Sequence, residues 1–225
     1  MYEEGAALSY WFFVFCIQSC QAWSDVSSSS YRFVYLVSSL NHHITLNSEA
    51  RADIQWWIDF FPSWNGVAFI QPEAVTSISL KLFSDASDLG FGALFGNLWF
   101  SSPWPSSFVD LHINVKELFA IVAAVLTWGE HLKDRQILFY TDNLPITHVW
   151  RSGTSSNPVI MKLVRHLFLF CARLNINVLM LHIPGHSNNA ADALSRLQVN
   201  RFHLLLKSAH RAPSAINPVV WTLLT

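Results

Sequence analysis

The sequence predicts an α/β fold, a mixed five-stranded sheet with helices packed on both of its faces. In residues 78–95, two short apolar runs flank an acid and a glycine-punctuated return, as expected for an antiparallel hairpin. In residues 112–198, helical apolar periodicity alternates with short apolar runs. Strands that first form a meander and then alternate with helices predict a mixed sheet covered by helices.

Residues 1–75 precede the predicted sheet and carry helical signals. The most apolar run, residues 8–17, is shorter than the roughly 20 residues that span a bilayer. It follows Glu3 and Glu4 rather than the basic start of a signal peptide. We therefore interpret it as a buried helix and expect no membrane partner. A targeting segment and a stretch that no longer folds are the alternatives.

A short amphipathic helix is predicted over residues 48–61, just before the sheet. Apolar residues recur there at helical spacing, Ser48 is a suitable N-cap, and Pro62 follows the last turn. We expect Trp56 and Trp57 to pack in a core, with base stacking as the alternative.

The predicted sheet begins with a strand, an acid and a tight return. Residues 78–83 mostly alternate apolar and polar side chains and lead into Asp85. Gly90 and Gly92 then break the pattern before a second apolar run, and residues 98–101 are expected to form a third strand. This arrangement presents a carboxylate at the end of the first strand.

Helices and strands alternate after a proline-rich loop. In residues 112–128, apolar side chains fall on one helical face, with Glu117 near its N-terminal end, and Gly129 is expected to end the helix. The remaining predicted elements are a strand at 136–140, a helix at 158–174 opened by Asn157, a strand at 177–182, and a final helix beginning near Asn188.

The composition indicates a large core and few charges. Hydrophobic residues make up 52% and charged residues 13% of the 225 positions, against about one quarter charged in typical soluble domains. The formal net charge of −1 excludes a global basic surface, so binding of nucleic acid requires a local patch or a metal site. Cys16, Cys20 and Cys171 match neither a disulfide framework nor a zinc pattern, which favours a reducing, intracellular setting.

Four acids follow the order first strand, first long helix, fourth strand and last helix: Asp85, Glu117, Asp142 and Asp192. Each alone has an ordinary explanation as a turn former, a solvated helix residue or a first-turn acid. Together they would bring hard oxygen ligands, which Mg²⁺ prefers, to one edge of the sheet. We predict a site for two Mg²⁺ ions, with Mn²⁺ as an alternative, that activates water and stabilises a leaving 3′ oxygen.

The motifs around these acids resemble the ribonuclease H domain that follows reverse transcriptase in retroelements. They read SDAS at 84–87, VKELFAI at 115–121, YTDN at 140–143 and HIPGHSNNAADALSR at 182–196. The segment before the sheet and the tail resemble those of DIRS-like elements, which carry a tyrosine recombinase. The resemblance is close over residues 48–198, fair over the tail and poor over residues 1–47.

This resemblance implies a ribonuclease H-like fold and cleavage of the RNA strand of RNA/DNA hybrids, with the four acids as catalytic metal ligands. It implies that His186 aids product release, against the alternative of a loop histidine without a role. Asn188 or Asn189 is expected to cap the last helix. The 2′-hydroxyls and the shape of the hybrid would select the substrate. The residues expected to contact it are Ser87, Asn143, Arg151, Lys162, Arg165 and Arg173, and a merely solvated basic helix face is the alternative for the last three.

The resemblance also predicts the organisation of the chain. Residues 1–75 would be a helical remnant of the reverse transcriptase thumb and connection, residues 76–198 the ribonuclease H-like domain, and residues 199–225 a linker tail. The implied partners are an RNA/DNA hybrid and a polymerase domain, whose Y-x-D-D motif this sequence lacks. Such enzymes act in cytoplasmic particles or in the nucleus, and both locations stay open.

Two other functions compete with this interpretation. A non-catalytic remnant that packs or binds nucleic acid would explain the low charge and the missing polymerase motif. An integrase or transposase of the same fold class is disfavoured, because those enzymes place their acids in the order Asp, Asp, Glu, whereas Glu117 comes second here.

Overall fold

The computed structural model describes residues 51, 55, 58, 80–153 and 155–224. The chain divides into two compact units, residues 1–71 with 151–154, and residues 72–150 with 155–225. The second unit contains all five strands of the described sheet.

The helix expected over residues 48–61 is described at three positions. Arg51, Gln55 and Ile58 are helical, as expected. The buried helix expected at 8–17 and the packing of Trp56 and Trp57 lie outside the described residues.

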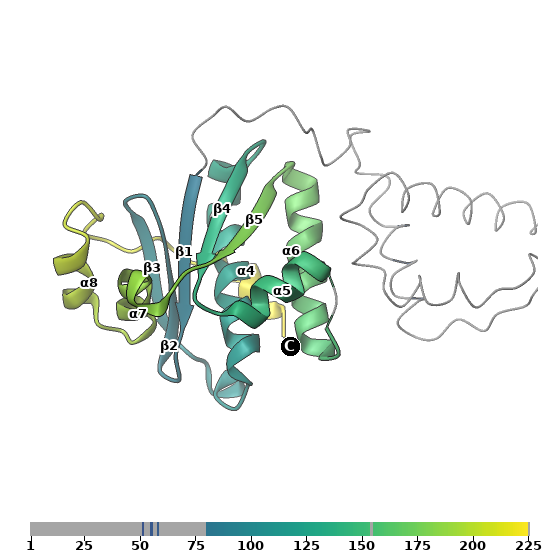
Figure 1. Ribbon diagram of the computed structural model, residues 1–225, viewed down its shortest axis with the longest axis horizontal. Helices are drawn as coiled ribbons and strands as arrows, with labels where there is room; N and C mark the ends of the chain where they lie inside the picture. The colour runs from purple at the N-terminus through teal and green to yellow at the C-terminus, as the bar shows by residue number, and fades with distance from the viewer. Residues whose placement is uncertain (1–50, 52–54, 56–57, 59–79, 154, 225) are drawn as a thin grey trace, which may run out of the picture. The chain divides into compact units, whose positions relative to one another are not determined.

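The predicted mixed sheet is confirmed. Its strands lie in the order β3-β2-β1-β4-β5, so β1 is central (Figure 1). β1 pairs antiparallel with β2 and parallel with β4, β2 pairs antiparallel with β3, and β4 pairs parallel with β5. The strands are β1 (Leu80–Ala86), β2 (Gly90–Phe95), β3 (Leu98–Pro103), β4 (Gln136–Thr141) and β5 (Asn177–His182).

The two long helices α4 and α6 begin with side-chain caps. His112 precedes α4, and its Nδ1 accepts a hydrogen bond from the Asn114 N–H at 3.1 Å. The Asn157 side chain caps α6 by accepting from the Val159 N–H at 2.9 Å, as the sequence predicted. The described helices are α4 (Ile113–Leu132), α5 (Leu144–Ser152), α6 (Pro158–Leu174), α7 (Asn189–Ser195) and α8 (Val199–Leu205), with short 3₁₀ turns η2 (Ser106–Phe108), η3 (Gly185–Ser187) and η4 (Pro218–Thr222).

The two faces of the sheet pack against different helices. Ala93 and Phe100 belong to the large core built around α4, whereas their neighbours Leu94 and Trp99 belong to a smaller core with α7 and Phe202. Successive side chains of a strand point to opposite faces, so α4 and α7 cover opposite faces of the sheet. The prediction of helices on both faces is confirmed.

The prediction that Gly129 ends the first long helix is wrong. α4 continues to Leu132, and Gly129 is buried in its last part. A Cβ atom at this position would lie 2.5 Å from the ring of Phe170 on α6. The glycine therefore permits close contact between two helices, and its lack of a side chain was mistaken for a stop signal.

The expected linker tail packs on the domain instead. Phe202 of α8 is fully buried in the smaller core, and Val220 and Leu223 are buried in the core around α4. The Asn217 side chain donates to the carbonyl of Leu126 in α4 at 3.2 Å. Residues 199–224 therefore belong to the folded unit, because their apolar side chains complete both cores.

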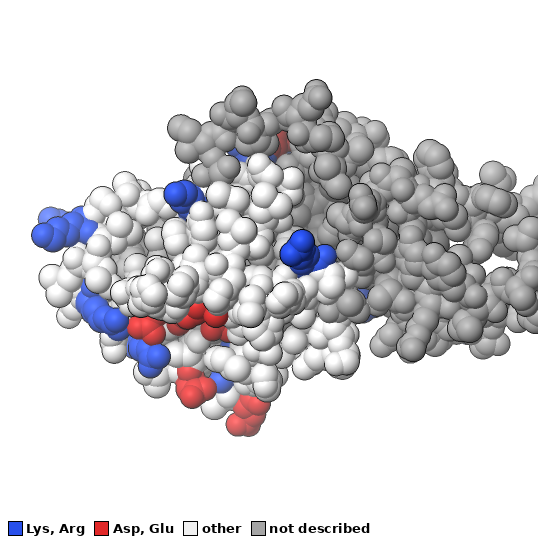
Figure 2. Space-filling model, viewed as in Figure 1, with Lys and Arg blue, Asp and Glu red and all other residues white. Residues whose placement is uncertain are grey.

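The described surface carries few charges. In Figure 2 most of the described surface in view is uncharged, with small groups of acidic and basic side chains. No helix in the described part of the chain combines the length and the apolar character that a membrane crossing requires.

Candidate active site

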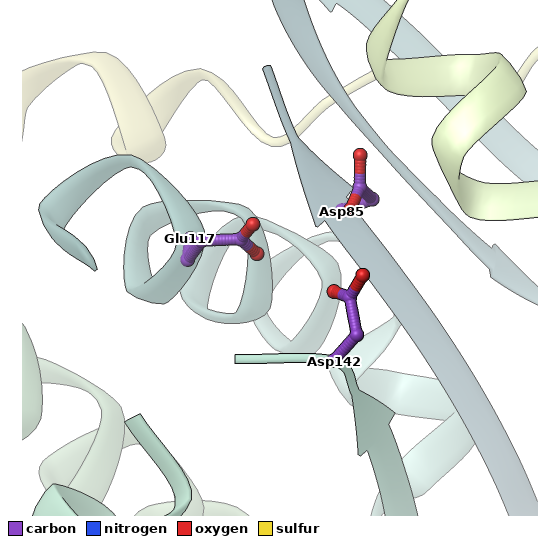
Figure 3. A group of neighbouring side chains, drawn as sticks. All are labelled: Asp85, Glu117 and Asp142. Atoms are coloured by element: carbon purple, nitrogen blue, oxygen red, sulfur yellow. The ribbon is translucent and has the colours of Figure 1, made fainter. Parts of the chain in front are cut away.

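Three of the four predicted acids converge. One carboxylate oxygen of each of Asp85, Glu117 and Asp142 lies within 4.8 Å of the others. Figure 3 shows these side chains coming from β1, α4 and the residue after β4. The structure thus brings together residues that are 57 positions apart at most, from three separate elements.

The sheet register explains why two of these acids meet. β1 and β4 are parallel neighbours, with Phe83 opposite Tyr140. Continuing this register by two residues places Asp85 beside Asp142. Adjacent parallel strands end at the same edge of a sheet, so both carboxylates reach one edge.

Glu117 reaches the same edge from α4. It lies in the second turn of a helix whose surrounding residues, among them Leu118 and Ile121, are completely buried against the sheet. The burial of α4 leaves Glu117 only 5% exposed. Its position is therefore fixed by the hydrophobic core rather than by a loop.

The three carboxylates are electrostatically unfavourable as they stand. Burial, together with the charges of Asp142 and Asp192, raises the pKa of Asp85 to about 7, although the Ser195 hydroxyl opposes this shift. Burial and the charges of Asp85 and Asp142 raise the pKa of Glu117 well above its usual value. None of the three acids forms an ion pair with another described residue. A bound cation would relieve this repulsion.

An unpaired oxygen indicates where a cation would fit. Glu117 Oε2 is buried and has no hydrogen-bond partner among the described residues. A buried carboxylate oxygen without a partner is costly. Carboxylates are among the hard oxygen ligands that Mg²⁺ and Mn²⁺ accept, so Asp85, Glu117 and Asp142 are suited to hold such an ion.

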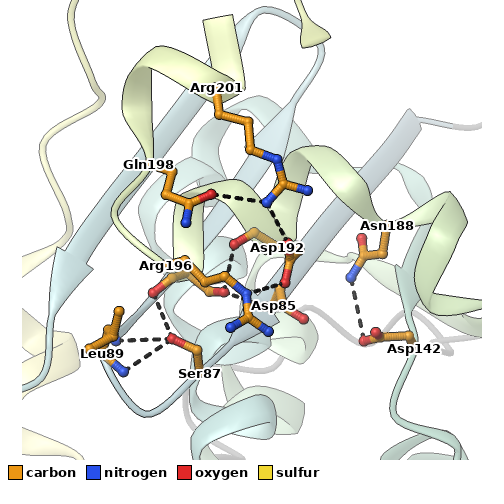
Figure 4. A network of polar contacts seen from close by, with 11 residues as sticks. Asp85, Ser87, Leu89, Asp142, Asn188, Asp192, Arg196, Gln198 and Arg201 are labelled. Atoms are coloured by element: carbon orange, nitrogen blue, oxygen red, sulfur yellow. Dashed lines mark hydrogen bonds and ion pairs between the residues drawn. The ribbon is translucent and has the colours of Figure 1, made fainter. Parts of the chain in front are cut away.

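The fourth predicted acid stands apart from this group. Asp192 lies on α7, and each of its carboxylate oxygens accepts from an arginine (Figure 4). Arg196 Nε donates to Oδ1 at 2.6 Å, and Arg201 Nη1 donates to Oδ2 at 2.9 Å. Asp192 is close enough to raise the pKa of Asp85. It therefore borders the three-carboxylate group, with its own charge balanced by two arginines.

The structure reveals Ser195 as a positioning residue that the sequence did not single out. Its buried hydroxyl donates to Asp85 Oδ2, which joins the end of α7 to β1. The motif containing Ser195 was recognised, but nothing in the sequence showed which side chain its hydroxyl meets. The contact orients Asp85 and favours its charged form.

Asn188 occupies the position before α7, yet its side chain does not cap that helix. Its amide nitrogen donates to the Ser84 carbonyl at 3.0 Å and to Asp142 Oδ1 at 3.4 Å. The expectation that Asn188 or Asn189 caps the last helix therefore holds for the position of Asn188 but not for a side-chain bond. The buried amide of Asn188 instead bridges the ends of β1 and β4 beside the acids, and Figure 4 shows its contact with Asp142.

Close packing of α7 on the hairpin depends on a glycine and two serines. A Cβ atom at Gly92 would lie 2.4 Å from Cβ of Leu194. Ser101 Oγ donates to the Leu194 carbonyl at 2.6 Å, and Ser87 Oγ donates to the Ser195 carbonyl at 2.9 Å. Gly92, which the sequence pattern places in a break between strands, instead lies within β2 and permits close packing of α7.

Two predicted substrate contacts have structural roles in this fold. The Ser87 hydroxyl also accepts from the Leu89 N–H at 3.1 Å, which closes the hairpin turn. Asn143 Oδ1 accepts from the Ile146 N–H at 3.0 Å at the start of α5, a helix that the sequence did not predict. Asn143 Nδ2 donates to Asn114 Oδ1 at 3.1 Å. Contact of Ser87 and Asn143 with a substrate stays a prediction.

The remaining predicted residues lie outside the three-carboxylate group. His186 is exposed in η3, the turn that precedes α7. Arg151 is exposed at the end of α5. Lys162 is exposed and Arg165 half-buried on α6, the helix that packs on α4. Their expected roles in product release and phosphate binding stay predictions.

The strand order, and the pairing of β1 antiparallel with β2 and parallel with β4, define the fold class. The described part of the chain has a ribonuclease H-like α/β fold, as the sequence predicted.

Comparisons with known proteins find likeness in solved structures only. No protein-family model matches the chain, and no curated protein matches it. Ribonuclease H1 LC11, isolated from compost by a metagenomic approach, is 16% identical with a TM-score of 0.45, over 55% of this chain and 96% of that one. Ribonuclease H1 from the halophilic archaeon Halobacterium salinarum is 14% identical with a TM-score of 0.42, over 55% of this chain and 98% of that one.

Proposed function

We propose that this chain is a metal-dependent ribonuclease that hydrolyses the RNA strand of RNA/DNA hybrids. The observation that carries the proposal is the buried group of Asp85, Glu117 and Asp142, whose oxygens lie within 4.8 Å of one another. Three carboxylates without ionic partners are unfavourable in a structural role. They suit a site that binds a divalent cation and places it against a phosphodiester.

The residues of this chain would have separate roles in metal binding and in orienting the acids. Asp85, Glu117 and Asp142 would hold Mg²⁺ or Mn²⁺, and Asp192 would contribute to a second ion once an arginine releases one of its oxygens. Bound metal ions supply an activated water and charge stabilisation for the leaving 3′ oxygen. Ser195 and Asn188 keep Asp85 and Asp142 oriented during the reaction, since each donates a hydrogen bond to one of them.

The reaction is a hydrolysis at phosphorus. Water adds to the phosphorus atom, the bond to the 3′ oxygen breaks, and the products carry a 5′ phosphate and a 3′ hydroxyl. The protein would recognise the hybrid by its shape and by the 2′-hydroxyls of the RNA strand rather than by base edges. His186, in the exposed turn before α7, is proposed to aid product release.

A retroelement is the proposed biological setting. The motifs at 84–87, 140–143 and 182–196 support it, together with the DIRS-like character of the flanking segments. Residues 1–75 would then derive from the reverse transcriptase thumb and connection. A polymerase domain would be the partner, and the site of action would be cytoplasmic particles or the nucleus.

Cleavage of labelled duplexes by the full chain tests the proposal. We expect Mg²⁺-dependent cutting of the RNA strand in an RNA/DNA hybrid, but not of RNA/RNA or DNA/DNA duplexes, and loss of cutting in Asp142→Asn. A folded chain that binds the hybrid without cutting it in Mg²⁺ or Mn²⁺ would reject the proposal in favour of a non-catalytic remnant. Strand transfer on DNA ends would favour an integrase or transposase.

A further inference from the structure

Charge is distributed unevenly along the chain. After Asp192, residues 193–225 contain no Asp or Glu, yet they contain four basic residues. The rest of the chain therefore has ten basic and fifteen acidic residues. The net charge of −1 thus combines a basic end with an otherwise acidic chain, a pattern typical of a local polyanion-binding surface. We call the four residues the basic tail: Arg196, Arg201, Lys207 and Arg211.

The backbone of the basic tail is held in place along the outer edge of the sheet. The His210 N–H donates to the Asn97 carbonyl at 2.9 Å, and the Ser214 N–H donates to the Trp99 carbonyl at 2.7 Å. Trp99 Nε1 donates in return to the His210 carbonyl at 2.6 Å. These bonds occupy the free edge of β3, so Lys207 and Arg211 project from a fixed backbone rather than from a loose terminus.

The basic tail begins at the acids themselves. Arg196 and Arg201 each bond to Asp192, and the charge of Arg196 lowers the pKa of Asp85. Their side chains remain 52% and 44% exposed. A guanidinium has five N–H donors, so each arginine keeps donors for a second anion while it pairs with the acid.

The far end of the basic tail lies only a few residues along the sheet, and two strands across it, from the acids. Asp85 is opposite Gly92, and Gly92 is opposite Ser101, four residues along the chain from Asn97. This spacing corresponds to roughly 14 Å along a strand and about 10 Å across two strand spacings. One strand of a duplex advances about 3.4 Å per phosphate, so the distance corresponds to roughly five phosphates.

The surface view agrees with this placement. Figure 2 shows basic side chains gathered on the left flank, where Figure 1 has α7, α8 and the following segment, next to acidic side chains. Lys207 and Arg211 are both exposed.

We propose that the basic tail binds the phosphate backbone of the RNA/DNA hybrid on one side of the cleavage site. This inference deepens the proposed function and rests on it for the identity of the ligand. Lysine and arginine contacts to phosphates supply affinity and register without reading sequence. The segment expected to be a linker thus becomes part of the substrate-binding surface, in addition to the α6 residues that the sequence predicted.

The test compares two double variants of the full chain that lose the same charge. Lys207→Gln with Arg211→Gln removes the far half of the basic tail and leaves the arginines at Asp192 intact. Lys133→Gln with Arg135→Gln is the matched control. Both control residues are exposed in the turn that precedes β4, whereas Asp142 follows the other end of that strand. Affinity for a labelled hybrid is measured by fluorescence anisotropy in Mg²⁺, in the Asp142→Asn background, over a range of salt concentrations.

We expect the tail variant to bind the hybrid about tenfold more weakly than the parent at low salt. Its slope of log K against log salt should be shallower by about 2, because each lost phosphate contact reduces the slope by roughly 0.9. The control variant should match the parent. With Asp142 restored, the tail variant should show a raised KM and an unchanged kcat, because it leaves all four acids in place.

Three outcomes would overturn the inference, and a fourth would reject only the proposed function. Equal binding by both variants and the parent would exclude the basic tail from the interface, and equal weakening would show a nonspecific charge effect. Displacement of the hybrid by polyglutamate at equal charge would point to an acidic protein as the partner. Tail-dependent binding without any cleavage by the wild-type chain would reject the proposed function and leave this inference standing.

Discussion

The two faces of the sheet hold the acids in different ways. On the face of α4, Glu117 sits on a 20-residue helix, most of which is buried, and the packing of this helix places Glu117 beside Asp85 and Asp142. On the opposite face, Asp192 sits on the seven-residue α7, which is held by serine hydroxyls and flanked by arginines.

The difference follows from helix size. A helix of seven residues buries little apolar surface, so polar contacts must fix its position. The position of Glu117 is therefore fixed by packing, and the three carboxylates have no ion pair among the described residues. Asp192 instead pairs with two arginines, and exchange of these partners would adjust its charge balance. Substitutions on the two faces should consequently have effects of different kinds.

The largest effect is expected from Glu117→Gln. Loss of a ligand oxygen should reduce hybrid cleavage by at least about 1,000-fold, since metal contacts contribute several kcal/mol to the transition state. The same change relieves carboxylate repulsion, so the metal-free variant should unfold at a higher temperature than wild type. Cleavage assays and calorimetry in EDTA check both expectations. A less stable, fully active variant would contradict the role given to the α4 face.

Gly92→Ala should be the most damaging small change on the α7 face. The new Cβ would meet Leu194 at 2.4 Å and force α7 away from β2, at a cost of about 1–3 kcal/mol of unfolding free energy. Urea unfolding measures this cost. Gly96→Ala is the control, because a Cβ there meets nothing within 4 Å and only the left-handed backbone (φ 59°) opposes it. Equal losses for the two variants would contradict close packing of α7.

Ser195→Ala should have a smaller effect that is shared between stability and metal binding. Removal of the hydroxyl takes a hydrogen bond from Asp85, worth about 1–2 kcal/mol of unfolding free energy. It should also raise the pKa of Asp85 further, so more Mg²⁺ is needed for half-maximal cleavage at neutral pH. Ser101→Ala loses a bond to α7 without touching an acid, and should alter stability alone. An unchanged Mg²⁺ requirement in Ser195→Ala would contradict a role for the Ser195–Asp85 hydrogen bond in metal binding.

A separate effect is the pH dependence of stability without metal. The pKa of Asp85 is about 7 in the folded chain and about 4 when unfolded, so the folded state binds more protons between these values. Its contribution to stability is full below pH 4, falls as pH rises, and is lost above pH 7. Unfolding in EDTA at pH 5 and pH 8 measures it against Asp85→Asn, which lacks this titration. Mg²⁺ should restore the loss at pH 8, and identical pH profiles for the two chains would contradict the shift.

The sequence predicted the elements that follow from apolar periodicity. The bounds of α6 and β5 agree with those expected, and the five strands were all found. The order of the acids along these elements was enough to predict that Asp85, Glu117 and Asp142 would meet, because parallel neighbours share an edge of the sheet.

Contacts between distant segments escaped the sequence because local patterns do not encode them. Gly129 resembles a helix stop until Phe170 is seen against it, and Asn188 resembles a cap until Ser84 and Asp142 are seen beside it. The tail resembles a linker because its buried residues, such as Val220, are too few and too scattered to show a periodicity. The arginine partners of Asp192 were missed for the same reason.

The most direct test of the metal site is a titration of Mg²⁺ into wild type and Asp142→Asn in parallel. In the same samples, the unfolding temperature and the rate of cleavage of the RNA strand of a hybrid are measured. We predict that in wild type the unfolding temperature and the cleavage rate rise over the same range of Mg²⁺ concentration, and that neither rises in Asp142→Asn. Cleavage that persists in EDTA, or an unfolding temperature that does not respond to Mg²⁺, would contradict a metal-binding role for the three carboxylates.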